Sequence, residues 1–248
     1  MRSKSSTAPA TTPADIFATT HWTVVLAAGK GSPPEAARAL ESLCQIYWYP
    51  LYAYVRRQGY SKEDAEDLTQ GFFARFLARN YLEDVRSDKG RFRAFLLASL
   101  KHYLANEFHR SHRLKRGGGL APLSLDWRDA EARYGVEPAD AASPDKLYDR
   151  AWALLLLERV IAALGEESAS QGKTALFAAL KPFLMVDQDG VPYSQIATQL
   201  QLNEGAVRVA VHRLRRRYRA LLRKEIAQTL SDPSQVEAEL GALFSAFS

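Results

Sequence analysis

The side chains with the clearest chemical capacity form a basic run near the C-terminus. Between Val207 and Lys224 the chain has no acidic residue and eight positive charges, on Arg208, Arg213, Arg215, Arg216, Arg217, Arg219, Arg223 and Lys224. Guanidinium groups bind phosphate oxygens through parallel hydrogen bonds. The run therefore predicts an anionic ligand, and a solvated basic helix of a structural bundle is the alternative.

The elements that must position these arginines lie between Tyr193 and Leu222. Apolar residues at spacings of three and four predict a helix-turn-helix, with a short helix at 193–200 and a long one from 204 to about 229. The outward side of the long helix carries Arg208, His212, Arg215, Arg216 and Arg219. Such a helix suits the major groove, with its first residues at base edges and later arginines on phosphates. Gln201 occupies the turn position that often holds glycine, so a positive φ there would cost about 1 kcal/mol.

A second chemically distinct segment, from Ser61 to Leu77, is acidic. Ser61 followed by Asp64 is typical of a helix start. At about 100° per residue, one face carries Glu63, Asp64, Asp67 and Gln70, and the opposite face carries Ala65, Leu68, Phe72 and Phe76. The apolar face should pack into the domain, which leaves a carboxylate stripe suited to a basic protein surface. A merely solvated surface is the alternative.

Basic and aromatic side chains interleave between Arg91 and Arg116. We expect a helix from about Phe92 to Leu114, stopped by three consecutive glycines at 117–119. On it, Lys101, Arg110 and Arg113 are suited to phosphates, and Tyr103 and Asn106 are suited to exposed bases, as in proteins that bind single strands. Ordinary core packing is the alternative for this helix.

The rest of the chain predicts an all-α fold with two small helical domains joined by an acidic linker, the C-terminal domain being a helix-turn-helix. We expect a flexible tail at 1–14, a helical domain at 15–116, a linker at 117–145, the helix-turn-helix domain at 146–230 and an amphipathic extension at 231–248. Pro50 should end or kink a helix at 34–57. Six acidic and two basic residues give the linker a net charge of −4, and we expect it to be extended.

The composition and the absence of known motifs exclude several classes of protein. With 47% hydrophobic and 25% charged residues the chain is a folded globular protein. The single cysteine, Cys44, permits no internal disulfide, and the five histidines lack metal-ligand spacing. No phosphate loop or nucleophile motif is present, so we expect no enzyme activity, no metal and no cofactor. No membrane span or secretory signal is recognisable, so we expect a cytoplasmic protein without membrane contact.

The acidic segment, the basic and aromatic segment and the helix-turn-helix follow one another along the chain as in the extracytoplasmic-function (ECF) group of bacterial RNA polymerase sigma factors, which the chain resembles. This group comprises the compact sigma factors that keep only regions 2 and 4. The resemblance covers about Tyr47 to Glu225. DAEDLTQGFFARFL at 64–77 resembles the polymerase-docking helix, GRFRAFLLASLKHYLANEFHRSHRLKR at 90–116 the promoter-melting helix, and YSQIATQLQLNEGAVRVAVHRLRRRYRALL at 193–222 region 4.

The resemblance implies a sigma factor that binds core RNA polymerase and directs promoter recognition, melting and transcription initiation. It implies polymerase contacts by Asp64, Asp67 and Gln70. It implies contacts with the single-stranded −10 element by the loop from Asn80 and by Arg91, Arg93, Lys101, Asn106, His109, Arg110 and Arg113. It implies contacts with the duplex −35 element by Glu204, Arg208, His212, Arg213 and Arg216. An anti-sigma factor or another regulator is left open as a further partner.

Two rival interpretations remain at this point. A stand-alone helix-turn-helix regulator without polymerase contact explains the C-terminal half equally well. An adaptor without DNA contact is the other rival. A separate hypothesis concerns the amphipathic segment from Val236 to Phe247, which could cover a sigma surface in place of a separate anti-sigma partner.

Overall fold

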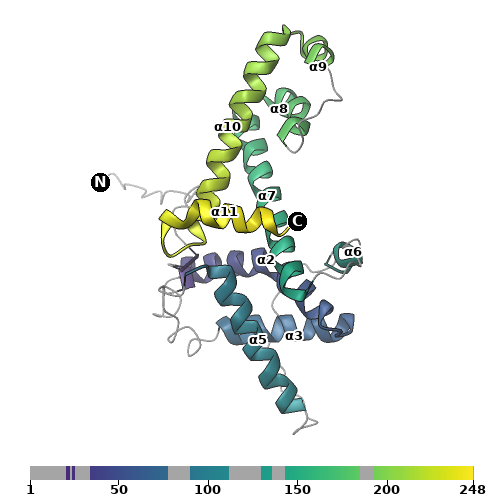
Figure 1. Cartoon of the computed structure of the whole chain (residues 1–248), viewed down its shortest axis with the longest axis vertical. Coiled ribbons are helices and arrows are strands. Elements are labelled where there is room, and N and C mark those ends of the chain that lie inside the picture. Colours follow the sequence, from purple (N-terminus) through teal and green to yellow (C-terminus); the bar gives the residue numbers. More distant parts are fainter. Residues whose placement is uncertain are drawn as a thin grey trace, which may run out of the picture.

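The computed structural model describes residues 21–22, 24–25, 34–77, 90–111, 130–135, 143–184 and 193–247 (Figure 1). Their regular structure is helical, in the order α2 (Pro34–Arg57), α3 (Lys62–Leu77), α5 (Phe92–Ser111), α6 (Ala130–Gly135), α7 (Pro144–Ser170), α8 (Thr174–Leu180), η3 (Lys181–Leu184), α9 (Tyr193–Leu200), α10 (Glu204–Gln228), η4 (Pro233–Gln235) and α11 (Val236–Ser245). The β-type pairing among these residues is one isolated antiparallel bridge, between Arg91 and Leu230. The predicted all-α class is confirmed.

Several predicted features lie outside the described residues. They are the tail at 1–14, most of the loop that begins at Asn80, and the linker segments 117–129 and 136–142.

Pro50 does not end the helix in which it lies. α2 continues through Pro50 as one helix.

Local capping sets where the helices begin. The Asn203 side chain accepts a hydrogen bond from the Ala206 amide at 2.7 Å and caps α10. Ser61 Oγ accepts from the Asp64 amide at 3.0 Å, as the sequence pattern predicts for α3. Asp232 caps η4 by accepting from the Ser234 amide at 2.9 Å.

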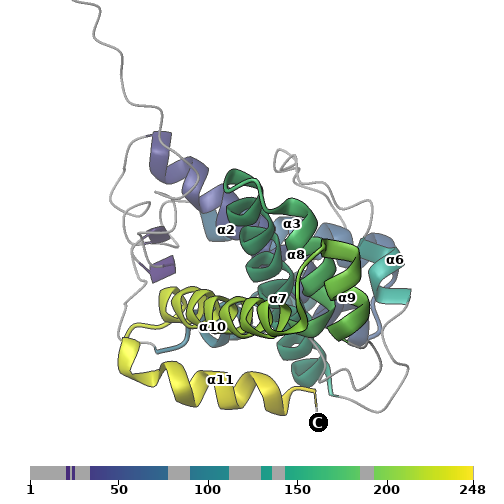
Figure 2. The same ribbon diagram turned by 90° about the horizontal axis from the view of Figure 1, so that it is seen from above.

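A large aromatic core joins elements from both halves of the chain. α2 contributes Tyr47, Leu51 and Tyr52, and the other helices contribute Phe72, Phe73 and Phe76 of α3, Phe92 and Leu96 of α5, Tyr148 and Trp152 of α7, Leu222 and Ile226 of α10, and Leu243 of α11. The first half of α7 packs along α2, and the end of α10 and α11 close the core from the other side (Figure 2). This core therefore contains residues that the sequence assigned to different domains.

A smaller core holds the helix-turn-helix together. Leu180 and Phe183 precede it, Ile196 and Ala197 come from α9, and Val207 and Val211 from α10. The small core lies at the far end of α7 and α10, away from α2, α3 and α5 (Figure 1). α7 and α10 thus connect the two cores, and we call this pair of helices the stalk.

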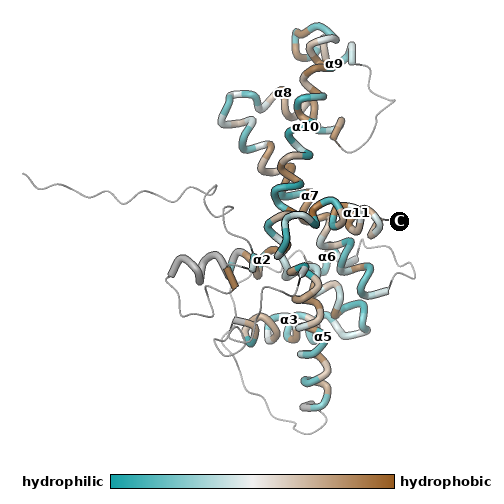
Figure 3. The backbone as a smooth tube through the Cα atoms, turned by 60° about the vertical axis from the view of Figure 1, so that its left-hand side comes forward, coloured by the Kyte–Doolittle hydropathy of each residue, from teal (hydrophilic) through white to brown (hydrophobic). Residues whose placement is uncertain are grey.

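The hydrophobic clusters do not divide the chain at the predicted linker. The predicted boundary lies at 146, whereas Tyr148, Trp152 and Val160 of α7 belong to the large core. Hydrophobic and hydrophilic stretches alternate along the tubes of α7 and α10 (Figure 3), as expected for helices that bury one side. The domain division remains a prediction.

Part of the linker is helical, where the sequence led us to expect an extended chain. α6 packs on α2, and Glu131 accepts hydrogen bonds from Arg56 Nη2 at 2.8 Å, from Arg56 Nε at 3.1 Å and from the Tyr52 hydroxyl. Arg56 also lies over the Tyr134 ring, 5.0 Å from its centroid. The expectation was wrong for residues 130–135 because α2 supplies a cation that pairs with a linker carboxylate.

Among the described helices, none combines the length and the apolar character that crossing a membrane requires.

Candidate nucleic-acid interface

The outward face of α10 forms a basic hollow beside α9. It is lined by Tyr193, Arg208, Val211, His212, Arg215, Arg216 and Arg219. The Arg208 guanidinium lies 5.4 Å from the centre of the Tyr193 ring and 3.7 Å from a Glu204 carboxylate oxygen. Arg215 Nε donates to the Phe183 carbonyl at 2.9 Å, which fixes this arginine at the edge of the small core. We call this surface the basic hollow.

The structure brings most of the predicted −35 residues together, with one exception. Arg208, His212 and Arg216 line the basic hollow, and Glu204 lies beside Arg208. Arg213 lies elsewhere, in an apolar groove that α10 forms with α7 and α8. The reason is helical geometry, since five residues turn Arg213 about 140° away from Arg208.

The turn between α9 and α10 has the strain that the sequence anticipated. Gln201 has φ of 54°, and it is the one non-glycine residue with positive φ in the part of the chain that the structure describes. The Leu202 amide donates to the Ala197 carbonyl at 2.9 Å and closes the turn.

Tyr193 lines the basic hollow, and sequence reasoning missed it, because its stacking on Arg208 depends on how α9 crosses α10.

The predicted −10 residues are split between the interior and the surface of α5. Arg93 is 5% exposed, donates from Nε to Glu239 at 2.6 Å and pairs with Asp149. Its guanidinium also lies 5.2 Å from the centre of the Trp152 ring. The prediction that Arg93 faces nucleic acid is wrong for this arrangement, because α7 and α11 cover it.

Two further cations of this set are also paired. Arg91 Nε lies 2.7 Å from the second Glu239 oxygen. Lys101 pairs with Asp145 and lies over the Tyr54 ring, and the hydrogen bond to Asp145 raises the pKa of its ammonium group. Arg113 lies outside the described residues, and for Arg110 only the backbone is described.

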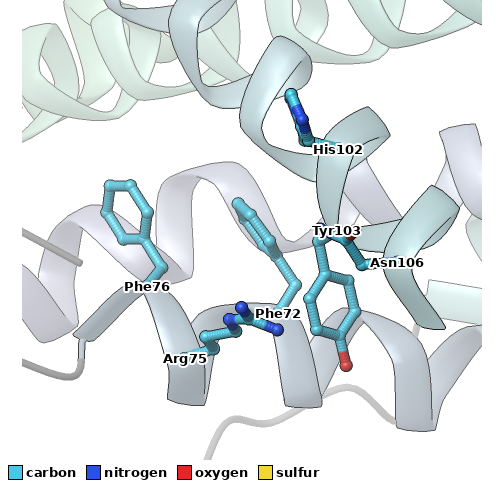
Figure 4. Close-up of a pocket in the computed structure, with 6 residues that line it drawn as sticks. All are labelled: Phe72, Arg75, Phe76, His102, Tyr103 and Asn106. Atoms are coloured by element: carbon cyan, nitrogen blue, oxygen red, sulfur yellow. The ribbon is translucent and has the colours of Figure 1, made fainter. Parts of the chain in front are cut away.

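Asn106 and His109 are exposed on the opposite side of α5 from Arg93. His109 is turned about 160° from Arg93 around the helix axis. Asn106 borders a pocket of about 80 Å³ between α3 and α5, with Phe72, Arg75, Phe76, His102 and Tyr103 as the other lining residues (Figure 4). The exposed polar residues Asn106 and His109 therefore lie in the second half of α5, on the side opposite Arg93.

α3 and α5 approach each other at this pocket beside Gly71. A β-carbon at Gly71 would lie 2.5 Å from the Tyr103 hydroxyl. The Tyr103 ring meets Phe72 edge-on, with 5.8 Å between centroids. Sequence reasoning placed Phe72 and Phe76 in the core and Tyr103 on a nucleic-acid surface, and it did not foresee that they share a pocket.

The acidic face of α3 has the predicted arrangement. Asp64 and Asp67 are exposed and Gln70 is half-buried, while the opposite face buries Ala65, Phe72 and Phe76. Two carboxylates therefore face outward from a helix that is anchored by aromatic side chains. Their role as a polymerase contact remains a prediction.

Comparison with known proteins gives one finding, which falls on the helix-turn-helix. A search of the curated proteins and of the solved structures returns no match to the chain. Residues 180–217 match the family model described as sigma-70, region 4. The match begins in α8 and ends in the basic half of α10, so it spans the small core and every lining residue of the basic hollow except Arg219. The helix-turn-helix of this chain is therefore similar to region 4 of the sigma-70 family, which indicates a DNA-binding role in transcription.

Proposed function

We propose that this protein is an ECF-type sigma factor that binds bacterial core RNA polymerase in the cytoplasm and directs it to promoters. The observation that carries the proposal is the sigma-70 region 4 match at 180–217, because it contains six of the seven residues that line the basic hollow. In this proposal Arg208, His212, Arg216 and Glu204 contact the −35 duplex.

The same proposal assigns the two other surfaces. The exposed carboxylates Asp64 and Asp67, with Gln70, contact the polymerase, because an acidic stripe on an anchored helix complements a basic protein surface. The exposed second half of α5, with Asn106 and His109, contacts the melted −10 strand. Lys101 and Arg110 adjoin these residues along the helix.

No step of this function requires a catalytic group. Strand opening follows when the complex binds the melted strand more tightly than the duplex, so the equilibrium shifts by differential affinity. The protein supplies positioned cations, polar groups and aromatic rings. We therefore propose no enzyme activity for the chain.

Promoter-directed transcription tests the proposal. Purified protein is added to bacterial core polymerase with a genomic promoter library, and the transcript start sites are sequenced. The proposal expects initiation at defined positions that depends on the protein. Random initiation, or initiation at the same positions without the protein, contradicts it.

A charge reversal tests the polymerase contact. Replacing Asp64 and Asp67 with lysine should abolish association with core polymerase and leave duplex DNA binding intact. Reversal of Glu158 and Glu166, two exposed acids of α7, makes the same change in net charge and serves as the matched control.

A stand-alone helix-turn-helix regulator is the second candidate, and it is favoured by the restriction of the family match to 180–217. It predicts that association with core polymerase is absent in the unmodified protein. DNA binding through the basic hollow is common to both candidates, so the association measurement distinguishes them.

A further inference from the structure

The last residues of the chain form a clasp on the base of the stalk. We call residues 231–247, which include η4 and α11, the C-terminal clasp. α11 lies across the base of α10, close to the start of α5 (Figures 1 and 2). The backbone at the start of the clasp is joined to the start of α5, since the Phe92 amide donates to the Thr229 carbonyl at 2.9 Å and the Ser231 amide donates to the Gly90 carbonyl at 3.3 Å, just before α5.

The clasp carries negative charge to two arginines at the start of α5, of which Arg93 is buried and Arg91 is partly exposed. It contains Asp232, Glu237 and Glu239 and no lysine or arginine. The Glu239 side chain is fully buried, and its two oxygens lie 2.6 Å from Arg93 Nε and 2.7 Å from Arg91 Nε. This carboxylate therefore pairs with both cations at the start of α5, and Arg93 has a second anionic partner in Asp149 of α7.

A carboxylate in this position makes the contacts that a phosphate group makes. Arginine binds carboxylate and phosphate oxygens with the same geometry. Removing one partner from a buried charge pair is costly, whereas exchanging the carboxylate for another anion keeps each guanidinium paired. Exchange for phosphate is thus the low-cost route by which Glu239 can leave.

The clasp is also built as a unit that can detach. α11 has ten residues, and a helix this short is marginal in water unless it is docked. It is anchored on one side, where Leu243 is buried and Val236 and Leu240 pack against the large core. Phe244, which follows Leu240 by one helical turn, is 58% exposed. Locally weak segments of this kind open without unfolding the rest of a protein.

We propose that the C-terminal clasp is an intramolecular ligand of Arg91 that competes with the phosphates of single-stranded nucleic acid for this partly exposed cation, while Arg93 stays paired with Asp149 of α7. Docking of Glu239 closes the surface, and nucleic acid binding displaces α11. This rests on the proposed function only in taking a nucleic-acid strand as the competing anion.

Two variants of the full chain release the clasp from different sides. Glu239→Gln removes the charge, and Leu243→Ser removes the apolar anchor and leaves every charge in place. Glu237→Gln is the matched control, since it makes the same chemical change on the same helix at an exposed pair with Arg223. Circular dichroism melting checks that each variant is folded.

Affinity for a fluorescent oligothymidylate is measured by anisotropy. Both releasing variants should bind about tenfold more tightly than the unmodified protein, which corresponds to about 1.4 kcal/mol. Glu237→Gln should bind like the unmodified protein. Adding Arg91→Gln to Glu239→Gln should remove most of the gain, because the released cation is then absent.

Hydrogen exchange of the α11 amides provides the second measurement. The oligothymidylate should accelerate exchange at 236–245 in the unmodified protein. Unchanged affinity in both folded releasing variants, or unchanged exchange when the oligonucleotide is bound, overturns the proposal. If Glu239→Gln does not fold, the affinity of the Leu243→Ser variant for the oligothymidylate alone tests the proposal. Failure of the sigma-factor proposal appears separately, as absent promoter-directed transcription while these responses persist.

Discussion

The two sides of α10 should contribute differently to DNA affinity, and this difference can be measured as a salt dependence. The basic hollow contains four arginines, Arg208, Arg215, Arg216 and Arg219. Each phosphate that a cation neutralises contributes about −0.9 to the slope of log K against log salt concentration. Four such contacts give a slope of about −3.6, or a loss in affinity of roughly 150-fold between 50 and 200 mM salt.

Replacing Arg208 with alanine should change that slope by about 0.9, to roughly −2.7. Replacing Arg213 should leave it unchanged, because Arg213, although exposed, lies on a different side of α10 from the basic hollow, in the groove beside α8. Fluorescence anisotropy of a labelled duplex, titrated with the full-length protein at several salt concentrations, gives both slopes. Tyr193→Phe keeps the ring under Arg208 and should bind like the unmodified protein.

Equal losses of slope for Arg208→Ala and Arg213→Ala would refute this assignment of faces. So would an unchanged slope for Arg208→Ala in a variant that melts normally. The second result would mean that the basic hollow does not contact phosphates.

Further outcomes follow from single residues of the two cores and the turn. Burial raises the pKa of the Cys44 thiol to about 12, so iodoacetamide at about pH 8 should alkylate the native protein roughly a thousandfold more slowly than the unfolded chain. Hydrogen bonds from Arg56 lower the pKa of Glu131, so its contribution to stability should be present above about pH 4.3 and be lost as pH falls through the native pKa. Denaturant unfolding at a series of pH values should show this loss, and Glu131→Gln should not. Gln201→Gly should raise the unfolding free energy by about 0.5 kcal/mol, since relief of about 1–2 kcal/mol of left-handed strain exceeds the extra entropy of glycine in the unfolded chain; thermal melting measures it.

Contrary results are equally specific. Fast alkylation of native Cys44 would show that the core around α2 opens readily. Identical pH profiles for the unmodified protein and Glu131→Gln would mean that α6 is not held by its pairing with Arg56. A lower melting temperature for Gln201→Gly would mean that the Gln201 side chain contributes more than its backbone costs.

Local sequence patterns were sufficient to predict several of the helices and the two faces of α3. The α3 face with Ala65, Phe72 and Phe76 is buried, and Asp64 and Asp67 are exposed. The start of α10 and the positive φ at Gln201 also agree with the sequence pattern. These features depend on residues within one or two helical turns, where spacing alone determines which side chains share a face.

Which cations remain exposed was decided by contacts between distant parts of the chain. Arg93 has the residue type and helix position of a phosphate contact, and it is buried because Glu239, 146 residues away, reaches it from α11. Glu131 lies in a segment with linker composition, and it is ordered by Arg56, 75 residues away. Periodicity gives the direction of a side chain around its own helix, but it carries no information about which other helix will cover that side. For this protein local sequence patterns determined most of the helices and the basic face of α10, and the packing of α7, α10 and α11 on the N-terminal helices determined which arginines remain available to bind an anion.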